Sequence, residues 1–186
     1  MSLNKEQKKF LLSLARDTIM ATLQNRELPQ VRVDESELTK YCGAFVTLHK
    51  NGQLRGCIGS LIGEKPLYLT VQEMAIEAAF RDPRFPPVSL EEMKNIEIEI
   101  SVLSPLERIT DVNQIKVGVH GIYLIKGFNR GVLLPQVATE HGWDRDTFLD
   151  HTCLKAGLPP GCWRSGAEIY IFSAEIFSEK ELGIID

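Results

Sequence analysis

A thiol, a permanent cation and two glycines occur together in one stretch of six residues, Leu54–Gly59, which reads L-R-G-C-I-G. A cysteine reacts as its thiolate, and a nearby cation favours that form. Glycines let backbone amides approach a ligand, and a guanidinium can hold a phosphate or carboxylate. We therefore take Cys57 as the candidate nucleophile, with Arg55, Gly56 and Gly59 as candidate contacts for the substrate.

Other residues complete this hypothesis. A histidine is the usual base for a cysteine nucleophile, and His120 lies within the glycine-flanked sequence G-V-H-G. Arg84, in a proline-rich segment, and Glu140, four residues after Gln136 on an expected short helix, would orient the substrate. The alternative is that Cys57 is a buried cysteine that only packs, because such cysteines are common and inert.

Several other chemistries find less support. The stretch matches neither the P-loop nor the Rossmann fingerprint, and its G-x-x-G spacing resembles that of the KH RNA-binding loop. A net charge of −4 argues against a general nucleic-acid binder. Local nucleic-acid binding through Arg55, Arg81 and Arg84 stays open. The chain contains no C-x-x-C and no H-E-x-x-H, so we expect no metal site and no cofactor.

The stretch is expected to form the second strand of a hairpin. Residues 44–49 suit a strand, and Asn51-Gly52 is a strong signal for a two-residue turn. That turn predicts a register in which His49 faces Leu54 and Val46 faces Cys57. Because side chains alternate along a strand, the register places Arg55 and Cys57 on one face. Leu54 and Ile58 then share the other face with Phe45.

The remaining pattern predicts an α+β fold with a mostly antiparallel sheet and flanking helices, since the hairpins favour antiparallel pairing. We treat residues 1–186 as a single domain and leave open two lobes with a cleft between them. Helices are expected over residues 4–26, 66–80, 135–141 and 144–156. Strands are expected over residues 96–102, 122–125, 132–134 and 168–177.

Composition indicates a globular protein, with 44% hydrophobic and 25% charged residues. No apolar run approaches the ~20 residues that span a bilayer, and no signal-peptide core follows the polar N-terminus. We therefore expect a cytoplasmic protein without a membrane segment. In that compartment the four cysteines are expected to be free thiols.

The chain resembles the AMMECR family, of the AmmeMemoRadiSam system protein A type. The resemblance runs from about Tyr41 to Phe177 and includes L-R-G-C-I-G, R-D-P-R-F-P-P, G-V-H-G, L-P-Q-V-A-T-E and G-W-D in the expected order. It implies an α+β domain of two subdomains with the first motif at the cleft between them. It also implies a family without a settled activity, whose prokaryotic members are associated with a Memo-like protein and a radical SAM protein.

Three functions follow as hypotheses. The first is thiol-dependent chemistry on a small molecule, peptide or nucleotide-like substrate, with Cys57 as nucleophile and His120 as base. The second is a non-enzymatic adaptor that binds the Memo-like or the radical SAM protein. The third is a regulator that binds nucleic acid locally.

Overall fold

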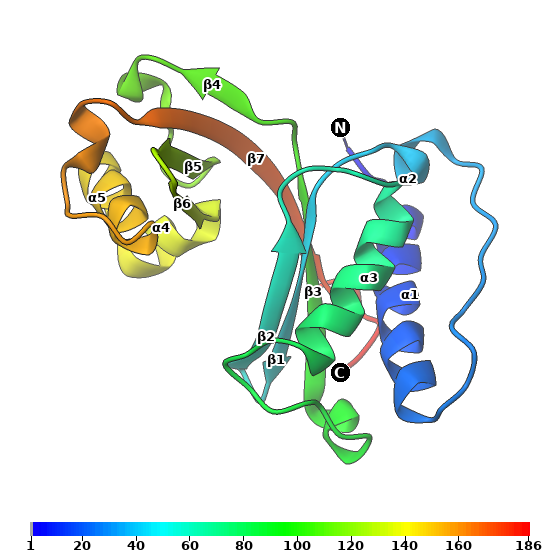
Figure 1. Ribbon diagram of the computed structural model, residues 1–186. Helices are drawn as coiled ribbons and strands as arrows, with labels where there is room; N and C mark the ends of the chain where they lie inside the picture. The colour runs from blue at the N-terminus through cyan, green and yellow to red at the C-terminus, as the bar shows by residue number, and fades with distance from the viewer. Residues whose placement is uncertain (1) are drawn as a thin grey trace. The chain divides into compact units, whose positions relative to one another are not determined.

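The computed structural model describes residues 2–186 and divides the chain into two compact units. The first unit comprises Met1–Leu103 and Glu175–Asp186, and the second comprises Ser104–Ala174. Both contain antiparallel strands and helices, so the predicted α+β class is confirmed (Figure 1). None of the described helices is long and apolar enough to cross a membrane.

The first unit is an antiparallel sheet covered on one face by two helices. Its strands lie in the order β2-β1-β3. Its elements are α1 (Lys5–Leu23), α2 (Ser36–Thr39), β1 (Ala44–Lys50), β2 (Gln53–Ser60), α3 (Leu67–Phe80), the 3-10 helix η1 (Glu91–Asn95) and β3 (Ile96–Leu103). Apolar side chains of α1 and α3 pack on those of β1 and β3 to form its core. The helix starts are defined locally, since Asn4 and Gln7 form a capping box at the start of α1.

The second unit has its own hydrophobic core, and the long last strand of the sheet is shared by the two units. Its elements are β4 (Glu107–Ile109), η2 (Val112–Gln114), β5 (His120–Lys126), β6 (Asn129–Leu133), α4 (Pro135–His141), α5 (Arg145–Lys155), η3 (Cys162–Arg164) and β7 (Glu168–Ser178). The strand order is β4-β7-β5-β6, and Glu175–Ser178 of β7 belong to the first unit. The hairpin and both helices agree with the sequence prediction, whereas β4, only three residues long, was not predicted.

The hairpin β1–β2 forms at the predicted turn but not in the predicted register. Asn51 and Gly52 have φ angles of 52° and 81°, as the turn requires. His49 pairs with Leu54 as predicted. A β-bulge between Leu48 and His49 then shifts the pairing by one residue. The extra residue is Arg55, which has no partner on β1.

The shift corrects the predicted assignment of side chains to faces. Cys57 pairs with Thr47 instead of Val46, and Phe45 pairs with Gly59. Phe45 therefore shares the face of Cys57 and not that of Ile58. The opposite face carries fully buried side chains, and it is the face that α3 covers.

The cysteines are not all free thiols, contrary to the sequence prediction. Cys153 in α5 and Cys162 in η3 form a disulfide, with their Cα atoms 6.0 Å apart. Cys42 and Cys57 are free. The prediction was wrong because the two cysteines, nine residues apart, pair only if the loop after α5 brings Cys162 back to Cys153. The spacing alone does not reveal this.

Candidate functional site

Arg55 is held by a carboxylate that sequence reasoning did not single out. Its Nε and Nη2 donate to Oε1 and Oε2 of Glu92 at 3.0 and 3.3 Å. Lys50 Nζ donates to the same carboxylate at 2.9 Å. The hydrogen bond from Arg55 is the main reason that the pKa of Glu92 falls to about 2. The cation proposed to grip a substrate is thus already engaged, and only its buried Nη1 has no hydrogen-bond partner.

Glu92 is positioned by its own backbone. The Ser89 amide donates to Glu92 Oε2 at 2.8 Å, and the Glu92 amide donates to Ser89 Oγ at 3.4 Å. This reciprocal pair has the hydrogen-bond pattern of a capping box and lies at the turn just before η1. The S-x-x-E spacing is visible in the sequence and would have marked Glu92 as a fixed carboxylate.

The backbone of Cys57 is clamped by the segment that follows α3. Its amide donates to Asp82 Oδ2 at 3.0 Å, and its carbonyl accepts from Arg84 Nη2 at 3.3 Å. Since β2 is an edge strand, these are outward-facing groups that would otherwise face solvent. Asp82 and Arg84 thus replace a neighbouring strand at this position. We call Asp82, Arg84 and Cys57 the edge clamp.

The two charges of the edge clamp also neutralise each other. Arg84 Nε and Nη2 donate to Asp82 Oδ1 and Oδ2 at 3.0 and 2.8 Å. Hydrogen bonding from Arg84 holds the pKa of Asp82 well below its usual range. The Asp82 side chain is 2% exposed, whereas that of Arg84 is 51% exposed. Arg84 was predicted to orient a substrate, and here it orients β2.

The thiol of Cys57 lies on the sheet face opposite α3 and is half-buried. Its Sγ is 3.2 Å from Thr47 Oγ1, its partner across the strands, and Glu99 pairs with Thr47 from β3. Burial raises the pKa of Cys57 above its ordinary value of 9.0, and this effect exceeds the lowering by Thr47 and Arg84. The thiol is therefore protonated at neutral pH, the opposite of what an activated nucleophile requires.

The two glycines of the motif allow close packing. A Cβ added at Gly56 would lie 2.3 Å from the carbonyl oxygen of Ala78 in α3. A Cβ added at Gly59 would lie 2.2 Å from the ring of Phe45. Gly56 thus brings β2 against a helix backbone, and Gly59 accommodates a cross-strand aromatic ring.

Phe85 joins the two arginine sites. Its ring centroid lies 5.4 Å from Arg84 Cζ and 5.9 Å from Arg55 Cζ, within range of cation–π attraction. Three prolines, at positions 83, 86 and 87, restrict the backbone around it. The result is a segment with a restricted backbone, in which Asp82 and Arg84 contact β2.

His120 and Glu140 lie in the second unit, so the structure does not bring them into one unit with Cys57. His120 begins β5, and its Nδ1 accepts from the Lys116 amide at 3.1 Å. Glu140 is exposed on α4. Their roles as base and substrate contact stay predictions.

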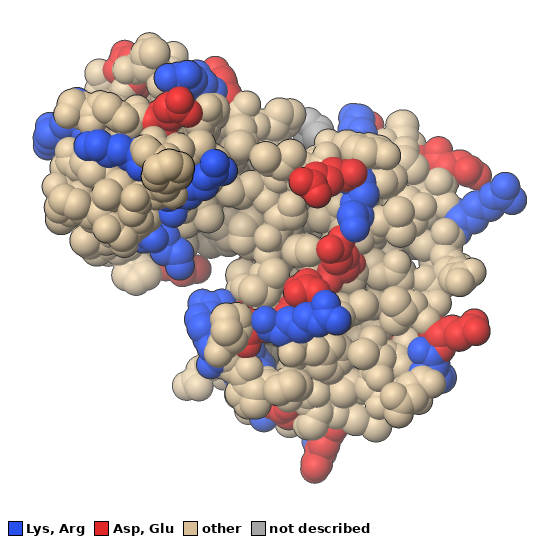
Figure 2. Space-filling view, in the orientation of Figure 1, with Lys and Arg blue, Asp and Glu red and all other residues tan. Residues whose placement is uncertain are grey.

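The arginines proposed for nucleic-acid contacts are paired in the first unit. Arg81 Nη1 donates to Glu77 Oε1 at 2.7 Å, and Arg55 and Arg84 hold Glu92 and Asp82. In the view of Figure 2, Lys and Arg of this unit lie beside Asp and Glu without a continuous basic surface. These pairs reduce the number of cations that phosphates can use.

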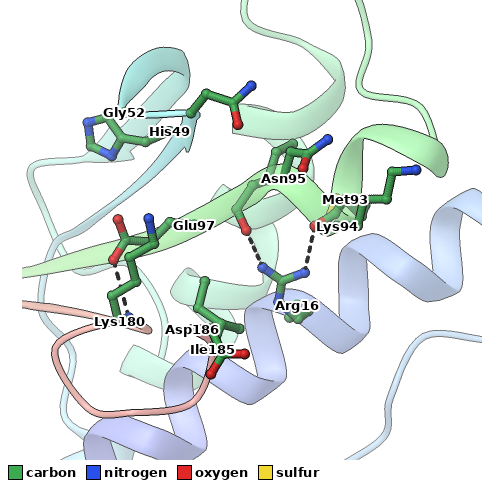
Figure 3. A pocket seen from close by; sticks show the side chains of 12 residues that line it. Arg16, His49, Gly52, Met93, Lys94, Asn95, Glu97, Lys180, Ile185 and Asp186 are labelled. Carbon is green, nitrogen blue, oxygen red and sulfur yellow. Dashed lines mark hydrogen bonds between the residues drawn. The ribbon is translucent and has the colours of Figure 1, made fainter.

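The first unit also contains a pocket of about 410 Å³ that is not lined by Leu54–Gly59 (Figure 3). It is lined by the β1–β2 turn, η1, the start of β3 and the C-terminal residues. Arg16 donates to the carbonyl oxygens of Met93 and Ile96 there and forms a 2.6 Å ion pair with buried Glu179. The Arg16 guanidinium is therefore already occupied by these structural contacts. Among residues 2–186, no three His, Cys, Asp or Glu side chains are grouped to hold a metal ion.

Comparisons with known proteins agree with this fold. The AMMECR1 family model matches residues 12–177. A Pyrococcus furiosus protein is 46% identical, covering 92% of this chain and 87% of its own. A Methanosarcina mazei protein is 43% identical, covering 91% and 90%.

A solved structure extends the likeness to three dimensions. The crystal structure of an uncharacterised protein from Pyrococcus horikoshii matches with a TM-score of 0.87 and 44% identity, covering 92% of this chain and 90% of that one. None of these three names states an activity. With a family model that matches most of its length, the chain belongs to the AMMECR1 family.

Proposed function

We propose that this AMMECR1-family protein is a non-enzymatic adaptor, in which Leu54–Gly59 and the proline-rich segment 81–87 keep a partner-binding surface rigid. The observation that carries the proposal is the edge clamp. Asp82 and Arg84 neutralise each other and occupy both outward backbone groups of Cys57. Asp82 and Arg84 hold the backbone of β2 in place in this way, so these side chains are not free to act on a substrate.

The surface beside the clamp suits protein binding. Leu54 and Leu90 are 43% and 48% exposed, and Pro86 and Pro87, which follow Arg84 in the chain, are also exposed. Apolar side chains with a rigid backbone lose little conformational entropy on binding. The resemblance names the partners to test, a Memo-like protein and a radical SAM protein.

The competing function is thiol-dependent catalysis with Cys57 as nucleophile and His120 as base. It requires the thiolate near neutral pH. The pKa of Cys57, which burial raises despite the lowering by the Thr47 hydrogen bond, works against that requirement. The adaptor hypothesis needs only that Cys57 fills its place in β2.

Calorimetry with the purified Memo-like and radical SAM proteins encoded in the same genome tests the proposal. We expect one of them to bind, and Leu90→Glu to weaken binding at least about 10-fold. Leu154→Glu is the matched control, because Leu154 is 50% exposed but lies in α5. Cys57→Ser should change the affinity by less than about twofold. Absence of binding to both proteins, or equal losses from the two leucine variants, would contradict the adaptor hypothesis.

A further inference from the structure

The sheet of the second unit has one face that α4 and α5 do not cover. Ile109, Ile169 and Leu124 line up across β4, β7 and β5 and belong to the core of this unit. Gly131 continues that row, and a Cβ added there would meet the backbone of α5. Side chains one residue along each strand therefore point away from the helices. Figure 1 shows α4 and α5 on one side of these strands.

This second face carries two tyrosine rings on adjacent strands, whereas Phe172, farther along the same face, is buried. Arg108 on β4 is opposite Tyr170 on β7, Tyr170 is opposite Tyr123 on β5, and Tyr123 is opposite Val132 on β6. The two tyrosine rings have centroids 6.0 Å apart and are half-exposed. Base–aromatic stacking uses such rings on adjacent strands of a sheet.

Arginines flank the rings on both sides. Arg130 is exposed, and its Nη1 donates to the hydroxyl of Tyr123 at 3.2 Å. The Arg108 side chain is 60% exposed and lies 4.0 Å from Glu168, a loose ion pair. Glu168 also accepts from the Tyr170 hydroxyl at 3.2 Å, so it is the carboxylate that competes with an incoming anion.

A pocket of about 420 Å³ includes Arg108 in its lining but is not part of the row that contains Tyr123 and Tyr170. Ile109 and Ile169, which belong to the core on the helix-covered face, also line it.

We propose that this face binds single-stranded nucleic acid, with bases stacked on Tyr123 and Tyr170 and phosphates contacted by Arg108 and Arg130. The site differs from the paired arginines of the first unit, because its guanidiniums lie beside rings and are largely exposed. It does not rest on the adaptor function. The chain's net charge of −4 predicts weak binding that depends on few phosphate contacts.

Fluorescence anisotropy on the full chain tests the proposal, with fluorescein-labelled oligo-U RNA and oligo-dT DNA of about 12 nucleotides as probes. We expect saturable binding to at least one probe at low salt, and the two probes distinguish RNA from DNA. Two phosphate contacts predict roughly sevenfold weaker binding when salt rises fourfold. Absence of binding to both probes up to about 100 µM protein would overturn the proposal.

Variants locate the binding. Tyr170→Ala should weaken it about 10-fold, and Tyr170→Phe, which keeps the ring, should restore most of it. Arg108→Ala should weaken binding, because it removes a cation. Glu168→Gln should tighten binding, because it removes the carboxylate that pairs with Arg108. These two changes are on exposed side chains and keep the test decisive if Tyr170→Ala does not fold.

Tyr41→Ala is the matched control, since Tyr41 is 66% exposed in the first unit. Equal losses from Tyr41→Ala and Tyr170→Ala, or an unchanged affinity in both Arg108→Ala and Glu168→Gln, would contradict the proposed site.

Discussion

The two units use arginine in opposite ways. In the first unit Arg55 and Arg84 are each bound through two nitrogens to a carboxylate, and Asp82 is almost completely buried. In the second unit Arg108 and Arg130 are largely exposed beside tyrosine rings. A guanidinium already held by a buried carboxylate contributes to the shape of the protein. An exposed guanidinium beside a ring keeps donors for a ligand.

The largest effect is expected at Asp82. Asp82→Ala removes the acceptor of the Cys57 amide and leaves Arg84 without its carboxylate, so it should lower the free energy of unfolding by about 3–5 kcal/mol. Urea denaturation measures this loss. Asp111→Ala in the second unit, where the aspartate caps η2 from an exposed position, should cost about 1 kcal/mol. Equal costs would show that the edge clamp has no special structural role.

Substituting the glycines of the motif should give the next largest loss of stability. The two positions differ because one is packed against backbone and the other against a side chain. Gly56→Ala places a methyl against the Ala78 carbonyl in the helix backbone and should cost about 3 kcal/mol. Gly59→Ala meets the Phe45 ring, a side chain that can rotate, and should cost about 1 kcal/mol. Thermal or urea unfolding compares the two. A larger cost at Gly59 would contradict the packing of β2 on α3.

A smaller effect concerns acid stability and Glu92. The pKa of Glu92 is lowered in the folded protein from an ordinary 4.5 to about 2. Its stabilisation is therefore complete above about pH 5 and is lost as the pH falls from 4.5 towards 2. The contribution is on the order of 3 kcal/mol.

Glu92→Gln should be less stable than the native protein at pH 7, and this deficit should shrink as the pH falls from 5 to 2. Unfolding at several pH values measures the difference. Glu91→Gln is the control, because Glu91 is 87% exposed and forms only a 3.8 Å pair with Lys94. A deficit of Glu92→Gln that stays constant with pH would disprove the role of Arg55 in lowering this pKa.

Much of the fold follows from local signals. Asn51-Gly52 predicts the hairpin, Asp144 caps α5 through the Thr147 amide, and Gly142 ends α4 with a positive φ. These features depend on residues adjacent in sequence, and pattern reasoning detects them.

The candidate site is less accessible to such reasoning. The direction of Arg55 depends on a bulge that adds one residue to β2. The turn has a sequence signal, Asn51-Gly52, whereas the bulge has none. The clamp on Cys57 depends on where the chain after α3 meets an edge strand. The sequence therefore predicts the hairpin that contains Leu54–Gly59, while the partners of Arg55 and Arg84 become visible only in the tertiary structure.

The most direct test of the account is the ionisation of Cys57 in the folded protein. A Cys42→Ser variant leaves Cys57 as the one free thiol, since Cys153 and Cys162 are joined. Its rate of alkylation by iodoacetamide, followed by mass spectrometry, should rise with pH through and beyond 9, the ordinary pKa of a cysteine. At neutral pH it should be slower than that of free cysteine. A rate that reaches its plateau below about pH 8 and exceeds that of free cysteine would contradict the structural role and favour thiol chemistry.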